Sequence, residues 1–506
     1  MKLIRPGSIP EIDAHAIKIL SLDEETLIRR AGNAVADAIL ARYKYPKDVL
    51  VLCGGGNNGA DGYATALALR KAGVNALAAD VFDRGQRSEG GKAVLLEYTR
   101  SYGPPLSLAD VFLSVGATVI VDAVLGSGAK GPLTDDSRRL LKWLKKQPVP
   151  RVAVDIPLGV DADLGEAAED ALPADLTVVL SFYKRGLLSY PARGYCGELL
   201  LADIGIGQGP EYDAYISAIG TEAETVKSLL PERAPNSHKG TFGLVHAFAG
   251  SKKMRGAAHL AALAALRMGV GLMKLSTEEE VVRLAGRRLP ELLFDVTPPL
   301  PRWTEEEMLS KIKETDRAAA ILIGPGVGVS DALYRFLSLL ASQPGPPLIL
   351  DADALGAIAA YALDVDAFFS SAKRPLILTP HPLEFARLVG RTAAQVQSQR
   401  MRLALCYAKK WRVFLLLKGA CTVITDGDRL YINTTGSTAL AKGGSGDVLS
   451  GAVSAFVAEG AEPLSALAIA AYLHGAAGDS LAREVSEYGV LPSDLPLRMA
   501  QLINTL

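Results

Sequence analysis

Two glycine-rich stretches of this sequence contain an aspartate at or next to their end, and each has the setting of a turn that leads into a helix. Residues 54–62 read GGGNNGADG after an apolar run, and residues 443–447 read GGSGD before a helical run. A glycine turn that leads into a helix presents backbone N–H groups and about half a unit of positive charge to an anion. Both stretches therefore predict phosphate binding, and Asp447 is placed to take a proton from an attacking hydroxyl group.

Each motif also has a purely structural alternative. The first is compatible with an ordinary turn, and Asp447 with a helix-capping residue. The first half carries two more acidic residues, Asp122 and Asp155, each at the end of an apolar run. Because the carboxyl ends of parallel strands converge on one crevice, Asn58, Asp122 and Asp155 are expected to share a site.

The second half adds a tight turn and a histidine. KGACT at residues 418–422 lies between two apolar runs, as a loop that approaches a nucleotide does, and His381 follows the run at 376–379. A lone histidine at a strand end is often bound only to the backbone. Asp351 and Asp353 are interpreted as helix-capping and packing residues, and they are left out of the predicted site.

The elements that must position these residues alternate between strand and helix. Apolar runs predict strands at 49–52, 76–81, 119–121, 152–155 and 177–180, and then at 244–249, 321–324, 348–351, 376–379 and 414–417. Helical patterns lie between them, for example at 137–146 and 256–268. This order predicts α/β domains with parallel sheets covered on both faces. A chain of 506 residues is longer than a single hydrophobic core usually organises. We therefore expect two domains, at residues 1–215 and 225–506.

Composition excludes several classes of partner. Lys and Arg number 54 against 55 Asp and Glu, so neither nucleic acid nor an anionic membrane is an expected partner. The four cysteines have no metal-type spacing, so we expect them to be buried, free of disulfides and free of zinc. No long apolar run or leader pattern is present. We expect a cytoplasmic homo-oligomer with small-molecule ligands.

The first half resembles a known family. GGGNNGADG, VDAVLGSGAKG, VDIPLGVDADLGE and YKRGL, in this order, are similar to the NAD(P)HX epimerase domain of the YjeF N-terminal family. The resemblance implies a Rossmann-like fold, inversion of the hydroxyl-bearing carbon of hydrated NADH or NADPH, and a potassium ion. It assigns phosphate binding to Asn57, Asn58, Gly59, Ala60, Asp61, Gly126, Ser127, Gly128, Ala129, Lys130 and Gly131. It also assigns substrate contact and the acid/base role to Asp155.

The same resemblance places potassium at Asn58, Asp122 and Leu158. Leu158 stands where the family usually has Ser, and an aliphatic side chain offers no oxygen to a hard cation, so the ion must use backbone carbonyls or be lost. Lys184, in YKRGL, is a lesser candidate because a lone lysine in a loop is usually solvated. An inactive scaffold is therefore the alternative for this half.

The second half resembles the ADP-dependent NAD(P)HX dehydratase family. The similarity rests on HKGTFG, GPGVG, LDADAL, TPHPLE, KGACT and GGSGD, in this order from residue 238 to residue 447. It implies a ribokinase-like fold that uses ADP or ATP with Mg²⁺. It assigns the hydrated cofactor to Ala257, Gly326, His381 and Asp447, and the nucleotide to Lys418, Gly419, Ala420, Cys421, Thr422 and Gly446.

Together the two resemblances imply a lyase and isomerase that repairs hydrated cofactors. The first half would interconvert (R)- and (S)-NAD(P)HX, and the second would dehydrate the (S) form after phosphorylating its hydroxyl group. Two alternatives stay open: a dehydratase with an inactive first half, and a ribokinase-like kinase of a small molecule. A nicotinamide dehydrogenase fits poorly, because the first glycine loop lacks a downstream ribose-binding acid.

Overall fold

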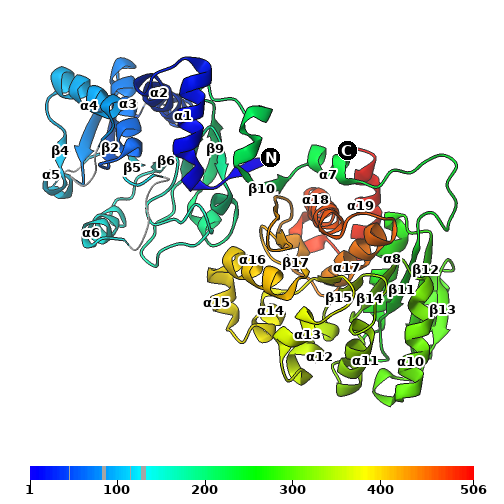
Figure 1. The fold of residues 1–506 in the computed structure, drawn as a ribbon. Helices are drawn as coiled ribbons and strands as arrows, with labels where there is room; N and C mark the ends of the chain where they lie inside the picture. The colour runs from blue at the N-terminus through cyan, green and yellow to red at the C-terminus, as the bar shows by residue number, and fades with distance from the viewer. Residues whose placement is uncertain (45, 83–86, 114–115, 127–132) are drawn as a thin grey trace. The chain divides into compact units, whose positions relative to one another are not determined.

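The computed structural model describes residues 1–506 except 45, 83–86, 114–115 and 127–132. The chain divides into two compact units (Figure 1). The N-terminal unit comprises residues 2–218, and the C-terminal unit comprises residues 219–506 together with Met1. Each unit is an α/β domain, which confirms the expected fold class.

The N-terminal unit is built on a parallel sheet. Among its described residues, seven strands lie in the order β4-β3-β2-β5-β6-β7-β9, and every neighbouring pair is parallel. The strands are β2 (Asp48–Cys53), β3 (Asn75–Asp80), β4 (Leu106–Ser107), β5 (Val119–Ala123), β6 (Arg151–Val154), β7 (Leu176–Leu180) and β9 (Glu198–Ala202). A separate short pair, β1 (Lys2–Ile4) and β8 (Tyr183–Lys184), is also parallel.

Helices cover both faces of this sheet, as the sequence predicts. Val49 and Val51 of β2 pack into the core formed with α2 (Glu24–Arg42), α3 (Asn57–Lys71) and α4 (Glu89–Tyr102). Leu50 and Leu52 belong to the opposite core, which includes α5 (Leu108–Leu113) and α6 (Asp135–Leu144). A strand that is buried on both faces must be apolar at every position, which explains the continuous run at 49–52.

One helix of this unit falls outside the sequence prediction. Helix α1 (Ile9–Leu20) buries Ile12 and Ala16 in a small core with Leu27 and Phe182. The helix therefore packs beside the start of α2 and the segment that follows β7, at the carboxyl ends of the strands.

The C-terminal unit contains a mixed sheet. Its described strands lie in the order β13-β12-β11-β14-β15-β16-β17-β18-β19-β10. They are β10 (Ile216–Thr221), of which residues 219–221 belong to this unit, β11 (Leu244–Phe248), β12 (Leu272–Thr277), β13 (Leu293–Val296), β14 (Ala320–Ile323), β15 (Leu348–Leu350), β16 (Leu376–Leu378), β17 (Phe414–Leu417), β18 (Val423–Thr425) and β19 (Leu430–Asn433). The pairs from β13 to β17 are parallel, and the β17-β18 and β18-β19 pairs are antiparallel.

The helices of the C-terminal unit again form layers. The core on one face joins alternate strand residues such as Val245 and Ile349 to α8 (Arg255–Met268), α17 (Ser445–Ala458), α18 (Pro463–Gly489) and α19 (Leu495–Ile503). On the other face, Phe248 packs against Phe336 of α11 (Asp331–Ala341) with ring centroids 5.1 Å apart. The remaining helices are α7 (Ala223–Leu229), α9 (Glu279–Arg288), α10 (Glu305–Glu314), α12 (Asp353–Tyr361), α13 (Val365–Ser370), α14 (Pro382–Leu388), α15 (Ala393–Ser398) and α16 (Arg400–Trp411).

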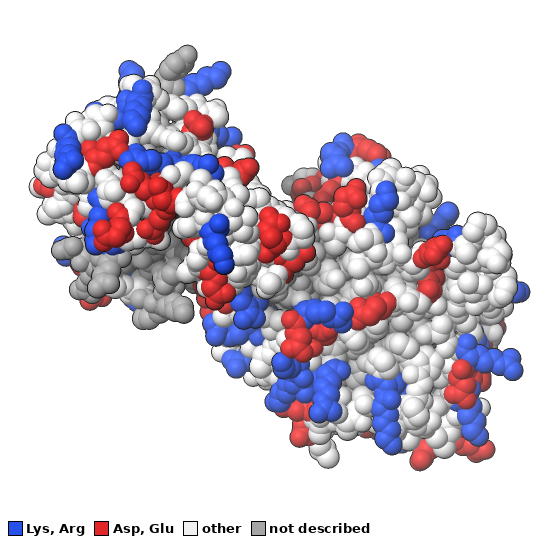
Figure 2. Space-filling model, turned by 45° about the horizontal axis from the view of Figure 1, so that its top comes forward, with Lys and Arg blue, Asp and Glu red and all other residues white. Residues whose placement is uncertain are grey.

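The surface carries interspersed charges. On the face shown in Figure 2, acidic and basic side chains lie next to one another on both units. Within the described ranges, no helix has the length and apolar character needed to cross a membrane. The cysteine prediction is wrong for two residues: Cys53 and Cys196 are buried, but Cys406 is exposed and Cys421 is half-buried.

Helices α2 and α3 approach each other so closely at Gly32 that a side chain there would not fit. A Cβ atom at Gly32 would lie 2.3 Å from the Cβ of Ala64. We expect Gly32→Ala to lower the free energy of unfolding of the N-terminal unit by about 1–3 kcal/mol, measured by calorimetry or chemical denaturation. The control is Gly256→Ala in α8, where a Cβ meets nothing within 4 Å; stability there should hold or rise. Equal effects of the two substitutions would contradict this packing argument.

Candidate active sites

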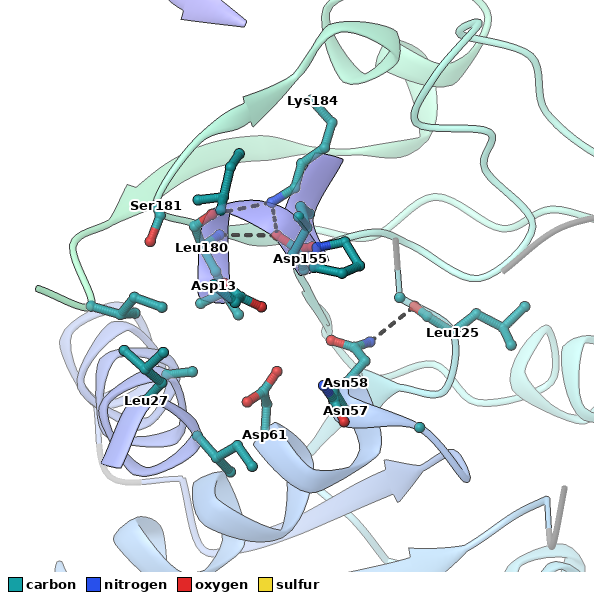
Figure 3. A pocket seen from close by; sticks show the side chains of 18 of the residues that line it. Asp13, Leu27, Asn57, Asn58, Asp61, Leu125, Asp155, Leu180, Ser181 and Lys184 are labelled. Atoms are coloured by element: carbon teal, nitrogen blue, oxygen red, sulfur yellow. Dashed lines mark hydrogen bonds and ion pairs between the residues drawn. The ribbon is translucent and has the colours of Figure 1, made fainter. Parts of the chain in front are cut away.

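The N-terminal unit contains a cavity of about 790 Å³ at the carboxyl ends of its strands. Helix α1, the first turns of α2 and α3, and the segments after β5, β6 and β7 line it (Figure 3). Four of its acidic or basic side chains come from four segments that are far apart in the sequence. They are Asp13, Asp61, Asp155 and Lys184.

The glycine loop brings the first turn of α3 against the end of β5. A Cβ at Gly54 would lie 1.9 Å from the carbonyl oxygen of Val124, so only glycine allows this approach. Helix α3 begins directly after the loop, so the predicted residues Asn57, Asn58, Gly59, Ala60 and Asp61 form its first turn. The backbone N–H groups at the start of this turn are those that a helix leaves without an intrahelical partner, and they suit an anion, whereas the N–H of Ala60 already donates to the carbonyl oxygen of Gly56 at 3.2 Å.

The second predicted phosphate segment is described only at its start. A Cβ at Gly126 would lie 2.9 Å from the Cβ of Asn58, so Gly126 packs against the α3 turn. The side-chain amide of Asn58 donates a hydrogen bond of 2.9 Å to the carbonyl oxygen of Leu125. Ser127, Gly128, Ala129, Lys130 and Gly131 lie outside the described residues.

Asp155 and Lys184 form a buried ion pair. The Lys184 ammonium donates to Oδ1 of Asp155 and, at 3.1 Å, to the carbonyl oxygen of Leu180. Oδ1 of Asp155 also accepts the N–H of Leu180 at 3.0 Å. The Lys184 side chain is only 1% exposed, so the expectation of a solvated lysine is wrong. The reason is tertiary: a buried ammonium is tolerated because this carboxylate pairs with it.

The predicted potassium residues meet only in part. Asp122 accepts the N–H of Leu158 at 2.8 Å and the N–H of Val124 at 3.2 Å, and burial raises its pKa to about 6. The amide nitrogen of Asn58 makes the bond to Leu125, and within the described residues no hydrogen bond involves its Oδ1. The side chain of Leu158 lies in an apolar core with Leu50 and Leu141. Of the three residues predicted to hold potassium, Asn58 and Asp122 therefore have side-chain oxygens, and Leu158 has only its carbonyl oxygen.

Two further carboxyl groups of the cavity, those of Asp13 and Asp61, have raised pKa values. Burial raises the pKa of Asp13 to about 6, and Asp155 and Glu24 raise it while Lys184 opposes them. Burial also raises the pKa of Asp61 well above its ordinary value, with Asp155 and Asp13 adding to the effect. Sequence reasoning missed Asp13. The available signal was an acidic residue beside Ile12 on the apolar face of an amphipathic pattern.

The C-terminal site is centred on Lys418, at the end of β17. Its ammonium donates a hydrogen bond of 2.9 Å to Oδ1 of Asp351 and lies 4.0 Å from Oε2 of Glu384. A Cβ at Gly446 would lie 3.2 Å from this ammonium, so the predicted nucleotide residues Lys418 and Gly446 are neighbours. Asp351, interpreted from sequence as a capping residue, is instead the buried partner of Lys418.

The GGSGD turn has the geometry of an anion-binding helix start. Gly444 has a φ of +99°, which favours glycine, and α17 begins at Ser445. The Ser445 hydroxyl lies 3.2 Å from Nε2 of the buried His474. Burial raises the pKa of Asp447 to about 7, and the charge of Asp351 adds to the rise while Lys418 opposes it. Asp447 thus titrates in the range that suits proton transfer near neutrality.

The KGACT segment forms a tight turn between β17 and β18, as predicted. Gly419 has a φ of +140°, and its carbonyl oxygen accepts the Thr422 hydroxyl at 2.8 Å. The buried guanidinium of Arg400 donates to the carbonyl oxygens of Leu417 and Lys418, both at 3.1 Å. Gly419 and Ala420 at the tip are exposed, and Cys421 has a φ of +51°. The turn therefore presents backbone groups to solvent, where a ligand can reach them.

The residues predicted to contact the hydrated cofactor fall in two groups. A Cβ at Gly326 would lie 2.9 Å from the Cβ of Ala257, so these two residues are adjacent. His381 caps α14: its Nδ1 accepts the N–H groups of Leu383 and Glu384 at 3.1 and 3.2 Å. Nδ1 of His381 is therefore bound to the backbone, as the structural alternative for this residue predicts. Its Nε2 lies 3.3 Å from Oε1 of Glu384, and Oε2 of Glu384 lies 4.0 Å from the Lys418 ammonium.

Asp353 also belongs to this neighbourhood. Its Oδ2 accepts the N–H of Gly328 at 2.8 Å, and burial raises its pKa, with Asp351 adding to the rise. Ala352, between the two aspartates, has a φ of +47°, a conformation that L-residues rarely adopt. The LDADAL motif therefore has a strained backbone at Ala352, between Asp351, which binds Lys418, and Asp353, which binds Gly328.

Comparisons with known proteins match both halves. Residues 24–186 match the model of the YjeF-related protein N-terminus, and residues 245–500 match that of NAD(P)H-hydrate dehydratase. Over 513 residues the chain is 33% identical to the bifunctional NAD(P)H-hydrate repair enzyme Nnr of Moorella thermoacetica. This alignment covers 98% of the chain and 95% of that protein.

Two solved structures resemble the C-terminal unit. A ribokinase-like superfamily protein of Enterococcus faecalis has a TM-score of 0.50 at 25% identity, and the match covers 57% of this chain and 96% of that one. This likeness confirms the expected ribokinase-like fold. The ADP/ATP-dependent NAD(P)H-hydrate dehydratase of Bacillus subtilis, co-crystallized with ATP and Mg²⁺, is 33% identical with a TM-score of 0.49, over 57% of this chain and 98% of that one.

The buried pair of the N-terminal cavity yields a stability prediction. We expect Lys184→Met to lower the free energy of unfolding of this unit by about 3–5 kcal/mol in urea denaturation, because it leaves Asp155 buried without its partner. Adding Asp155→Asn should recover most of the loss. Lys71→Met, at a side chain that is 66% exposed, is the control and should change stability by less than about 0.5 kcal/mol. A Lys184 variant as stable as this control would refute the assignment.

Proposed function

Because the chain belongs to the family of bifunctional NAD(P)H-hydrate repair enzymes, we propose that its N-terminal cavity inverts the hydrated cofactor and its Lys418 cluster dehydrates it. The protein is an NAD(P)H-hydrate epimerase and an NAD(P)H-hydrate dehydratase. The observation that carries this conclusion is the full-length match, which includes both motif sets in one chain. Hydration produces two epimers, and a dehydratase that accepts only the (S) form needs an epimerase to supply it from the other.

In the dehydratase half, Asp447 acts as the general base. Hydroxide leaves poorly from the hydrated ring, so the hydroxyl group is first converted into a phosphate ester. Asp447 takes the hydroxyl proton while the N–H groups at the start of α17 stabilise the transferred phosphoryl group. The lone pair of the ring nitrogen then expels phosphate, and loss of a proton from the neighbouring carbon restores the reduced cofactor. The cofactor rests against Ala257, Gly326 and His381.

The nucleotide, ADP or ATP, binds at the KGACT turn. The ammonium of Lys418 and the N–H groups around Gly446 face the transferred phosphate, and the exposed backbone at Gly419 and Ala420 holds the remainder. Mg²⁺ accompanies the nucleotide, since Asp351 and Glu384 supply the oxygen chemistry that this cation prefers. When bound, it neutralises charge on the phosphates. No group of three or more potential metal-binding side chains occurs in the part of the chain that the structure describes.

In the epimerase half, Asp155 contacts the substrate, and the ion pair of Asp155 with Lys184 exchanges protons with it. Its pairing with Lys184 holds the carboxylate at the cavity wall. The first turn of α3 and Gly126 bind the phosphates of the cofactor. Asn58, Asp122 and the carbonyl of Leu158 are the groups that would hold potassium, which would supply a fixed positive charge when bound.

One prediction from this function concerns the pH dependence of dehydration. Asp447 must be ionised to accept a proton, and its pKa is raised to about 7, so kcat should fall as the pH drops below 7 and level off above it. Asp447→Asn should lower kcat by about 100-fold or more and abolish this dependence. Recovery of absorbance at the reduced-cofactor band, with nucleotide and Mg²⁺, measures the rate on (S)-NADHX. Unchanged kcat in the variant would contradict the role of Asp447.

Another prediction separates the epimerase activity from the dehydratase activity. The wild-type chain should convert a mixture of both epimers completely and faster than spontaneous epimerisation allows. Asp155→Asn should stop after one epimer is consumed, because the C-terminal site remains intact. Asp175→Asn, an exposed aspartate in the same unit, is the control and should behave like the wild type.

Two results would overturn parts of this proposal. Wild-type recovery that stalls halfway would reduce the N-terminal unit to a scaffold. A stable phosphorylated product, with no reduced cofactor formed, would make the C-terminal unit a small-molecule kinase.

A further inference from the structure

Asp13 occupies the N-terminal cavity without belonging to any motif of the sequence. It lies on α1, outside residues 24–186 that match the N-terminal family model. Its carboxyl group points into the cavity, on the side where Asp155 and Lys184 lie (Figure 3). Within the described residues this carboxyl group makes no hydrogen bond or ion pair, whereas Asp155 accepts the N–H of Leu180 and pairs with Lys184. Asp13 is thus the less constrained of the two.

The charges in the cavity do not balance. Asp13 faces Asp155 at the end of β6, Glu24 at the start of α2 and Lys184 on β8. Asp61 of α3 faces Asp155, Asp13 and Lys184. Among the described residues that line the cavity, Lys184 is the one ammonium that serves these carboxyl groups, and Asp155 binds it directly. Carboxylates that crowd together in a poorly solvated site cannot all ionise at neutral pH. At least one carboxyl group here exchanges protons near neutrality, and Asp13, whose pKa is raised to about 6, meets that condition.

A second observation points to a polar ligand beside Asp13. The hydroxyl group of Ser181 is buried and lacks a hydrogen-bond partner within the described structure, although the residue lines the cavity (Figure 3). Ser181 has a φ of +59°, so the backbone holds this side chain in place despite an unfavourable conformation. Buried polar groups normally have partners, and a bound hydroxyl or amide group would supply the missing one.

Inversion at the hydroxyl-bearing carbon requires two coupled proton transfers. This carbon bonds both the hydroxyl oxygen and the ring nitrogen, so removal of the hydroxyl proton turns the C–O bond into a carbonyl group. The electron pair of the C–N bond passes to the nitrogen, which takes up a proton. After the carbonyl group has presented its other face, the reverse transfers close the ring with the opposite configuration. No electrons are gained or lost, and both protons return to their donors.

We propose, on the basis of the function assigned above, that Asp13 is a catalytic residue that takes and returns the hydroxyl proton, while the Asp155–Lys184 pair serves the ring nitrogen. Asp13 acts as the carboxylate and becomes a neutral acid when the ring opens. The Lys184 ammonium gives its proton to the nitrogen and regains it when the ring closes. Ser181 is a positioning residue that binds the hydroxyl or amide oxygen of the substrate.

The test measures inversion of purified (R)-NADHX by the full-length chain, with the uncatalysed rate subtracted. We expect Asp13→Asn to lower kcat by about 100-fold or more with little change in KM, because the amide keeps the shape but cannot exchange the proton. The wild-type rate should fall below about pH 6, and this limb should vanish in the variant. Asp13→Glu should retain measurable inversion with a displaced limb. Asp37→Asn, an exposed position on α2, is the matched control and should behave like the wild type.

Several outcomes would overturn the proposal. Inversion by Asp13→Asn within threefold of the wild type would remove Asp13 from catalysis, and a change confined to KM would make it a binding residue. If Asp13→Asn does not fold, a pH profile of Asp13→Glu identical to that of the wild type would refute the role. Absence of inversion by the wild-type chain would be a different result, because it would overturn the epimerase function itself.

Discussion

Among the described residues, each of the two sites places one lysine ammonium group among several carboxyl groups; Lys184 is buried and Lys418 is half-buried. Lys184 shares its cavity with Asp155, Asp13 and Asp61, and Lys418 lies against Asp351 and Glu384 beside Asp447. One cation cannot neutralise all of these groups, and burial makes each additional negative charge costly. The surplus carboxyl groups therefore keep protons at pH values where an exposed aspartate would have lost them. This imbalance provides acid/base groups near neutrality without histidine.

The backbone holds these charges in place through conformations that side chains normally avoid. Asp155, Ser181, Ala352 and Cys421 all have positive φ angles, and each lies in or beside one of the two sites. Such conformations persist only where the surrounding structure enforces them. The sheets supply that enforcement, because the hydrogen-bonded ladders of their strands fix the position at which the chain leaves each strand. Charge placement and backbone strain thus share one cause, the rigid carboxyl edge of each sheet.

Both units apply the same arrangement to related substrates. In each, a glycine turn before a helix presents backbone donors that suit an anion, and a lysine on another segment carries a positive charge. The units differ in the acid that acts with this lysine. Asp447 lies in the first turn of the phosphate-binding helix, where a base can act on a hydroxyl group that attacks phosphorus. In the N-terminal unit the acids come from other segments and surround a cavity, which suits proton exchange with an enclosed ring.

The sequence alone determined the main strands and the glycine turns that lead into helices, because apolar periodicity and glycine turns are local signals. The strands at 49–52 and 414–417 and the helix after the GGSGD turn are all present as predicted. The partners of buried charges could not be read in this way, since they come from distant segments. Lys184 looked like a solvated lysine and Asp351 like a capping residue until folding brought each against an opposite charge. Asp13 carried no motif, and only the packing of α1 over the strand ends placed it in the cavity. Local chemistry fixes what a residue can do, and the tertiary fold decides which charges it meets.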